Sequence, residues 1–103
     1  MKYSLTSKLI SEALGTFIFL GVIITVVNDK KSMANWLKIG LALSLAIVLF
    51  GNVSGGNFNP AVSFMLFIND QLTSTELFGY IIAQLFGALL AYYLFVNVTK
   101  VKE

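Results

Sequence analysis

Three long apolar blocks restrict the fold of this chain more than any other feature of its sequence. They run over about residues 9–27, 36–53 and 77–98, and each is long enough for one helical crossing of a hydrocarbon layer about 30 Å thick. Charged residues make up only 12% of the 103 residues, roughly half the share in a soluble domain. The sequence therefore predicts an all-α, multi-pass integral membrane protein.

The ends of the apolar blocks contain residues that suit a membrane surface. Trp36 and Lys38 are expected to be interfacial anchors, and the lysines at the segment ends can reach lipid headgroups. The basic N-terminus resembles the start of a signal peptide, but Glu12 interrupts its apolar core and no small-residue cleavage site follows. We therefore expect residues 9–27 to be a retained span, within a single domain covering residues 1–103.

A fourth apolar segment, residues 60–68, is too short to cross the membrane. Its nine residues would form a helix about 13 Å long, less than half the hydrocarbon thickness. Asn59 is a favourable N-cap and Pro60 suits the first helical position, whereas the glycine-rich residues 51–58 are unlikely to be helical. The pattern predicts a re-entrant loop and half-helix over about residues 54–68, added to three transmembrane helices.

The polar bend before Pro60 is expected to line a passage. Irregular backbone at membrane depth is tolerated only where it is buried in protein or lines a water-filled cavity. A helix N-terminus carries about half a positive charge and repels cations, while the Asn59 amide and the preceding carbonyls can bond to a neutral solute. The alternative interpretation is an ordinary helix cap in a surface loop.

The residue content excludes several kinds of chemistry. The chain has no Cys and no His, which excludes disulfides, thiol chemistry and Cys/His metal sites. No nucleophile–base pair is recognisable, so we expect neither an enzyme nor a cofactor. The net charge of +2 comes from seven scattered lysines, and no basic cluster indicates nucleic acid as a partner.

Two further features lie inside the predicted spans. Glu12 is the one acid well inside a span, where a charge costs on the order of 3 kcal/mol. It is either a proton carrier or a buried carboxylate that accepts hydrogen bonds from the re-entrant backbone. Small residues also recur at every fourth position of the last span and form a face suited to close helix packing: Gly79, Ala83, Gly87 and Ala91.

Three segments of the sequence carry a resemblance to a known family. SGGNFNPAVS, residues 54–63, resembles the first re-entrant loop of the aquaporin, or major intrinsic protein, family, whose usual form is S-G-x-H-x-N-P-A-V. EALGTF, residues 12–17, and AQLFGALLA, residues 83–91, resemble the family's first and third helices. The resemblance covers nearly the whole chain and implies a passive channel for water or small neutral solutes such as glycerol. It also implies that Glu12 and Gln84 support the loop.

The sequence departs from the family at the selectivity filter. Val62 stands where an Arg follows the corresponding motif of the family's second repeat, and Asn57 replaces the usual His. Two such halves would form a rather apolar constriction without Arg, which leaves room for glycerol beside water. The resemblance implies that the pore-lining and selectivity residues include Asn59, Pro60, Ala61, Asn57 and Val62, with Gly56 contributed by the loop. By spacing back from Asn59, the filter positions in the two middle helices resemble Ile39 and Ile47.

Family members contain two inverted repeats, and this sequence contains one. A pore then needs a second half, either a second copy of the chain or a complementary subunit. If the N-terminus is cytoplasmic, as the resemblance implies, Lys2 and Lys8 lie inside and the other five lysines lie outside. That contradicts the positive-inside tendency. Inverted or dual insertion would resolve the contradiction, and both suit an antiparallel pair.

Two alternative functions remain open at this point. A small proton-coupled transporter that uses Glu12, similar to the small multidrug resistance proteins, shares the short length and the acid in the first span. It expects four full spans and does not explain the half-helix. The other alternative is a non-conducting or split half that needs a separate partner. Dependence of transport on Glu12 titration and a proton gradient would separate the transporter from the channel.

Overall fold

The computed structural model describes residues 2–29 and 34–99, and helices are the only regular secondary structure among them. In chain order they are α1 (Leu5–Asn28), α2 (Asn35–Ser54), α3 (Pro60–Ile68) and α4 (Ser74–Thr99). Three of these helices, α1, α2 and α4, are long and apolar enough to cross a membrane. This confirms the predicted all-α fold of three transmembrane helices and one half-helix.

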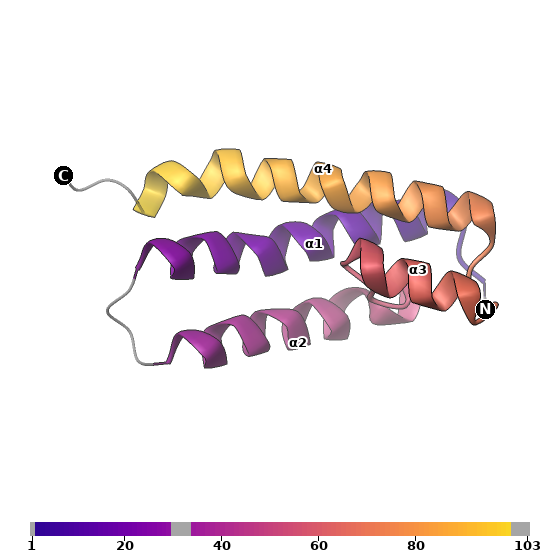
Figure 1. The fold of residues 1–103 in the computed structure, drawn as a ribbon, viewed down its shortest axis with the longest axis horizontal. Coiled ribbons are helices and arrows are strands. Elements are labelled where there is room, and N and C mark those ends of the chain that lie inside the picture. Colours follow the sequence, from indigo (N-terminus) through magenta and orange to yellow (C-terminus); the bar gives the residue numbers. More distant parts are fainter. Residues whose placement is uncertain (1, 30–33, 100–103) are drawn as a thin grey trace.

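The helix α1 lies at the centre of the molecule. It contacts both α2 and α4, while α3 packs against α4. Figure 1 shows the three long helices side by side, with α3 covering only one half of their length. The half-helix lies at the same end as the N-terminus, whereas α1 ends and α2 begins at the opposite end. The loop that leads into α3 therefore lies within the length of the bundle.

Polar side chains determine where α1 and α4 begin. Ser4 Oγ accepts a hydrogen bond from the Ser7 backbone N–H at 3.1 Å and caps α1. Thr73 and Glu76 exchange side-chain-to-backbone hydrogen bonds of 2.9 and 3.1 Å, which is a capping box at the start of α4. Glu76 also forms a 2.8 Å ion pair with Lys8. The two helices therefore start beside each other and run in the same direction.

The interface between α1 and α4 is close because α4 presents small residues to it. A Cβ atom at Gly79 would lie 2.8 Å from Leu9 Cδ2, and one at Gly87 would lie 2.5 Å from the Ala13 carbonyl oxygen. Ala83 and Ala91, on the same stripe, are both buried. Since the atom facing Gly87 belongs to the backbone, the two helices could not approach this closely with a larger residue there.

The outer surface of the long helices is apolar. Large hydrophobic side chains such as Ile10, Val48, Ile82 and Leu89 are exposed, as expected where lipid tails replace water around a transmembrane helix. Trp36 is exposed in the first turn of α2, the position predicted for an interfacial anchor. The buried positions of the bundle, in contrast, contain several polar side chains, and some of these bond to the re-entrant loop.

Candidate functional site

The loop between α2 and α3 reverses the chain through left-handed backbone conformations. The φ angles of Gly55, Gly56 and Phe58 are 94°, 67° and 54°. Glycine adopts this region without steric cost, whereas a bulky residue such as Phe58 does so only when its surroundings hold it there. The chain then enters α3 at Pro60, so the helix start predicted from Asn59 and Pro60 is confirmed.

Glu12 supplies hydrogen-bond acceptors beneath this loop. Its Oε2 accepts from the Asn57 backbone N–H at 2.9 Å and from Ser54 Oγ at 2.7 Å. Its Oε1 accepts from the Phe58 backbone N–H at 2.7 Å and from Gln84 Nε2 at 2.9 Å. The Glu12 side chain is 0% exposed. A carboxylate offers about four acceptor positions, and these four donors fill them.

A second layer of hydrogen bonds joins the loop to α3 and α4. Ser63 Oγ, in the first turn of α3, accepts from Asn57 Nδ2 and from Gln84 Nε2, both at 2.9 Å. The Tyr80 hydroxyl donates to the Ser54 carbonyl oxygen at 2.6 Å. All of these side chains are buried. The end of α2, the loop, α3 and α4 therefore share one buried polar network with α1.

The backbone of the loop has its donors paired and its acceptors open. The N–H of Gly55 bonds to Gly51 O at 2.9 Å, the N–H of Gly56 bonds to Ser54 Oγ at 3.2 Å, and the next two N–H groups bond to Glu12. Within residues 2–29 and 34–99, no protein donor reaches the carbonyl oxygens of residues 55–58. Gly55 is exposed and Gly56 is half-buried, whereas Asn57 and Phe58 are buried, so at its accessible glycines the loop has acceptors and not donors to offer a solute.

Asn59 follows these carbonyls and adds a donor. Its Oδ1 accepts from the backbone N–H of Ala61 at 2.7 Å and, more weakly, of Val62 at 3.4 Å. That bonding orients the amide, and its nitrogen has no acceptor among the described residues. Asn59, Pro60 and Ala61 are exposed and Val62 is half-buried. The start of α3 thus presents free amide hydrogens on an accessible surface.

The other predicted pore-lining residues are not all at this surface. Ile47 is exposed, and a Cβ at Gly56 would lie 3.4 Å from its Cγ1, so these two residues border the loop together. Ile39 is half-buried and precedes Ile47 on α2 by about 12 Å along the helix axis, nearer the start of that helix. The Asn57 side chain is only 5% exposed and bonds to Ser63. It therefore lies beneath the loop, not beside Asn59.

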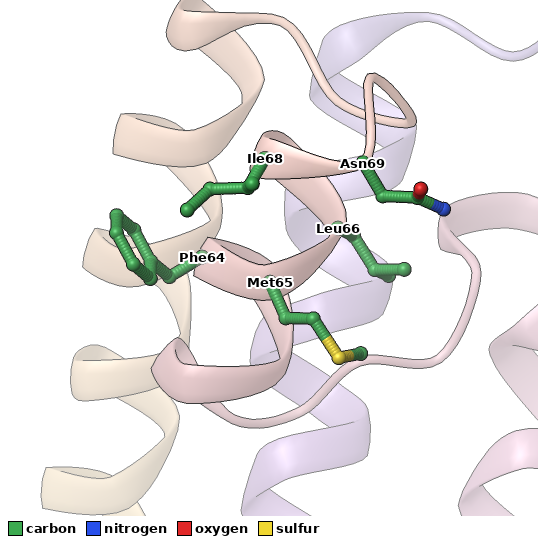
Figure 2. Close-up of a pocket in the computed structure, with 5 residues that line it drawn as sticks. All are labelled: Phe64, Met65, Leu66, Ile68 and Asn69. Atoms are coloured by element: carbon green, nitrogen blue, oxygen red, sulfur yellow. The ribbon is translucent and has the colours of Figure 1, made fainter.

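The outward face of α3 is apolar and uncovered. Figure 2 shows the side chains of Phe64, Met65, Leu66, Ile68 and Asn69 around a hollow beside this helix. The hollow has a volume of about 510 Å³, and Phe64, Met65 and Ile68 are more than half exposed. The half-helix packs on α4, where its buried Ser63 side chain bonds to Gln84. Both the exposed start of α3 and its apolar flank are therefore accessible from outside the bundle.

Several residues of the site have roles that their local sequence does not predict. Ser54 and Ser63 are in the polar segment, but nothing local shows that one bonds to Glu12 and the other to Gln84. Phe58 is 3% exposed and its ring lies against Gly15. The local signal for the contact between Phe58 and Gly15 is that Phe58 is a large apolar residue among glycines and asparagines. Among the described residues, no acidic group is arranged to hold a metal ion.

Comparison with known proteins shows the family to which the chain belongs. A model of the major intrinsic protein family matches residues 1–103. The chain belongs to the major intrinsic protein family. Membership and the three candidate spans make it an integral, multi-pass membrane protein.

Curated relatives in the family include channels named for water and for glycerol. The chain is 42% identical over 86 residues to Glycerol uptake facilitator protein-like 6 of Lactiplantibacillus plantarum, covering 82% of this chain and 40% of the relative. It is 41% identical over 85 residues to Aquaporin-8 of Mus musculus, covering 81% and 32%. It is 30% identical over 97 residues to Aquaglyceroporin AqpS of Rhizobium meliloti, covering 85% and 42%. The chain therefore spans less than half the length of these relatives.

Proposed function

We propose that this chain supplies one half of a passive membrane channel for water and small neutral solutes such as glycerol. The observation that carries the proposal is the order of hydrogen-bonding groups along the loop. Unpaired carbonyl oxygens of residues 55–58 lead to the free amide hydrogens of Asn59 at the start of α3. A hydroxyl-bearing solute can bond to acceptors and then to a donor as it moves past. The names of the relatives support this solute class.

The helix start also supports exclusion of ions. The N-terminus of α3 carries a partial positive charge, and residues 55–62 include no acidic side chain. A cation that gave up its hydration there would meet a positive potential, whereas a neutral solute would exchange one set of hydrogen bonds for another. We propose that Glu12 and Gln84 keep the loop rigid enough for this exchange.

The second half of the passage is proposed to come from another polypeptide surface. Either a second copy of this chain, in inverted orientation, or a complementary half-subunit would cover the exposed flank of α3 and face Asn59. An apolar constriction without Arg would then be formed by Val62, Ile47 and Gly56. Ile39 would lie apart from it, nearer the start of α2. An apolar constriction of this kind favours glycerol as a solute beside water.

The geometry gives no support for a proton-coupled transporter. The Glu12 carboxylate is fully buried, and both oxygens are occupied by four donors. A proton added to either oxygen would face a donor instead of an acceptor and would displace at least one of these bonds. The carboxylate is therefore proposed to act as a fixed support and not as a carrier.

Stopped-flow light scattering on proteoliposomes tests the channel proposal. We expect the protein to accelerate vesicle shrinkage under a water gradient and to admit glycerol under a glycerol gradient. Asn59→Asp should abolish both, because it replaces the amide donors with a negative charge. Asn97→Asp is the matched control, since Asn97 is exposed near the end of α4, away from the loop and α3, and it should conduct like the wild type. A folded wild type that conducts neither alone nor with a complementary family half would contradict the proposal.

A further inference from the structure

Phe58 combines burial with a strained backbone at the last position before Asn59. Its φ of 54° lies in the left-handed region, which bulky side chains rarely adopt. Its N–H donates to Glu12 Oε1 at 2.7 Å, and its side chain is only 3% exposed. A conformation of this kind persists only where surrounding contacts determine it. The hydrogen bond is one such contact, and the position of the ring is the other.

The ring of Phe58 occupies space that exists because residue 15 is a glycine. A Cβ atom at Gly15 would overlap Cε1 and Cζ of the ring and would lie 2.6 Å from Cδ1. Gly15 is buried on α1 three residues after Glu12, so both lie within about one helical turn. One turn of α1 therefore holds the backbone N–H of Phe58 through Glu12 and its ring through Gly15.

We propose that Gly15 and Phe58 are positioning residues that set how far Asn59 stands from α1, and so where it meets a solute. The Glu12 hydrogen bond determines the direction of the loop backbone, and contact between the ring and Gly15 determines its distance from the helix. Asn59 follows Phe58 directly, so an outward shift of Phe58 moves the amide donor with it. The effect on permeation rests on the proposed channel function, but the position of the half-helix is measurable without it.

The test replaces Gly15 with alanine and then shortens the ring that it meets. Gly15→Ala should force Phe58 outward. Phe58→Leu removes the Cε1 and Cζ atoms that would overlap the new methyl group, and its remaining Cδ atoms, unlike Cδ1 of the planar ring at 2.6 Å, end a flexible side chain that can turn aside. Gly15→Ala combined with Phe58→Leu should therefore restore the wild-type position. Gly40→Ala is the matched control for a helix glycine, because a Cβ there would meet nothing within 4 Å.

Two properties of each variant are measured, water permeability and the rate of thiol labelling. The first is water permeability in proteoliposomes, which should fall by about tenfold in Gly15→Ala because the contact becomes overpacked, and should largely recover in the double variant. The second is the rate at which a small thiol reagent labels Ala61→Cys, introduced into each background. The chain has no native Cys, and Ala61 is exposed at the start of α3. Labelling should change in Gly15→Ala and return in the double variant.

The outcomes separate this proposal from the channel proposal. A wild type that does not conduct would contradict the channel function, while labelling would still report the position of α3. Gly15→Ala with wild-type labelling would overturn the positioning role. So would a double variant that labels like Gly15→Ala alone. If Gly15→Ala alone does not fold, recovery of folding in the double variant supports the contact, and failure to recover it overturns the proposal.

Discussion

Gln84 on α4 donates a hydrogen bond from Nε2 to Oε1 of Glu12 on α1, at 2.9 Å and across 72 residues of sequence. The same nitrogen bonds to Ser63 Oγ on α3 at 2.9 Å. One amide group thus connects the central helix, the half-helix and the last span inside the bundle. Residues of this network are expected to affect stability and permeation together, whereas Asn59, at its exposed edge, should affect permeation more than stability.

Glu12→Gln is expected to lower the free energy of unfolding by about 3 kcal/mol, because an amide nitrogen would then face buried donors and leave them unpaired. Unfolding by SDS titration in detergent micelles, followed by circular dichroism, measures the change. Glu76→Gln is the matched control. Glutamine keeps the capping box with Thr73, and loss of the half-buried ion pair with Lys8 should cost at most about 1 kcal/mol. Equal destabilisation by both substitutions would contradict the support role of Glu12.

Tyr80→Phe removes one hydroxyl group from the site and leaves the ring in place. The hydroxyl donates to the Ser54 carbonyl oxygen at 2.6 Å in a buried position, and its loss should cost about 1 kcal/mol. Tyr93→Phe makes the same chemical change on the exposed surface of α4 and should have little effect. Thermal unfolding of the two variants in the same detergent compares them. The prediction fails if both unfold at the same temperature.

Gly87→Ala should separate α4 from α1. The added Cβ would lie 2.5 Å from the Ala13 carbonyl oxygen, and a helix backbone yields less readily than a flexible side chain. Overpacking of this kind costs about 1–3 kcal/mol. Gly40→Ala, where the methyl group meets nothing within 4 Å, provides the comparison in the same SDS titration. Wild-type stability for Gly87→Ala would show that α1 and α4 are not in close backbone contact at Gly87.

Substitutions of Asn59 should distinguish its two roles. Asn59→Ala removes the cap acceptor that bonds to Ala61 and is expected to cost about 1 kcal/mol of stability. Asn59→Asp keeps an acceptor at the cap and should be nearly as stable as the wild type, yet it should not conduct. Unfolding and stopped-flow measurements on the same preparations test both statements. A conducting Asn59→Asp variant would show that the amide hydrogens are not required.

The helices that depend on local signals were predictable. The expected spans 9–27, 36–53 and 77–98 lie within α1, α2 and α4, and the helix start at Pro60 follows from its N-cap. The long helices extend beyond the apolar runs because capping residues such as Ser4 and Thr73 determine where they begin. The loop conformation at Phe58 was not predictable, since no local preference favours a left-handed Phe.

The membrane class, the three spans, the half-helix that begins after Asn59 and an acid inside a span, either a carrier or a support, all follow from the amino-acid sequence. The folded chain adds that the Glu12 carboxylate bonds to the loop backbone, that Asn57 turns beneath the loop, and that the Phe58 ring lies against Gly15. Span length and helix caps are local properties of a sequence. The Glu12 contacts join residues 42 to 72 positions apart, and which faces meet depends on how the helices pack.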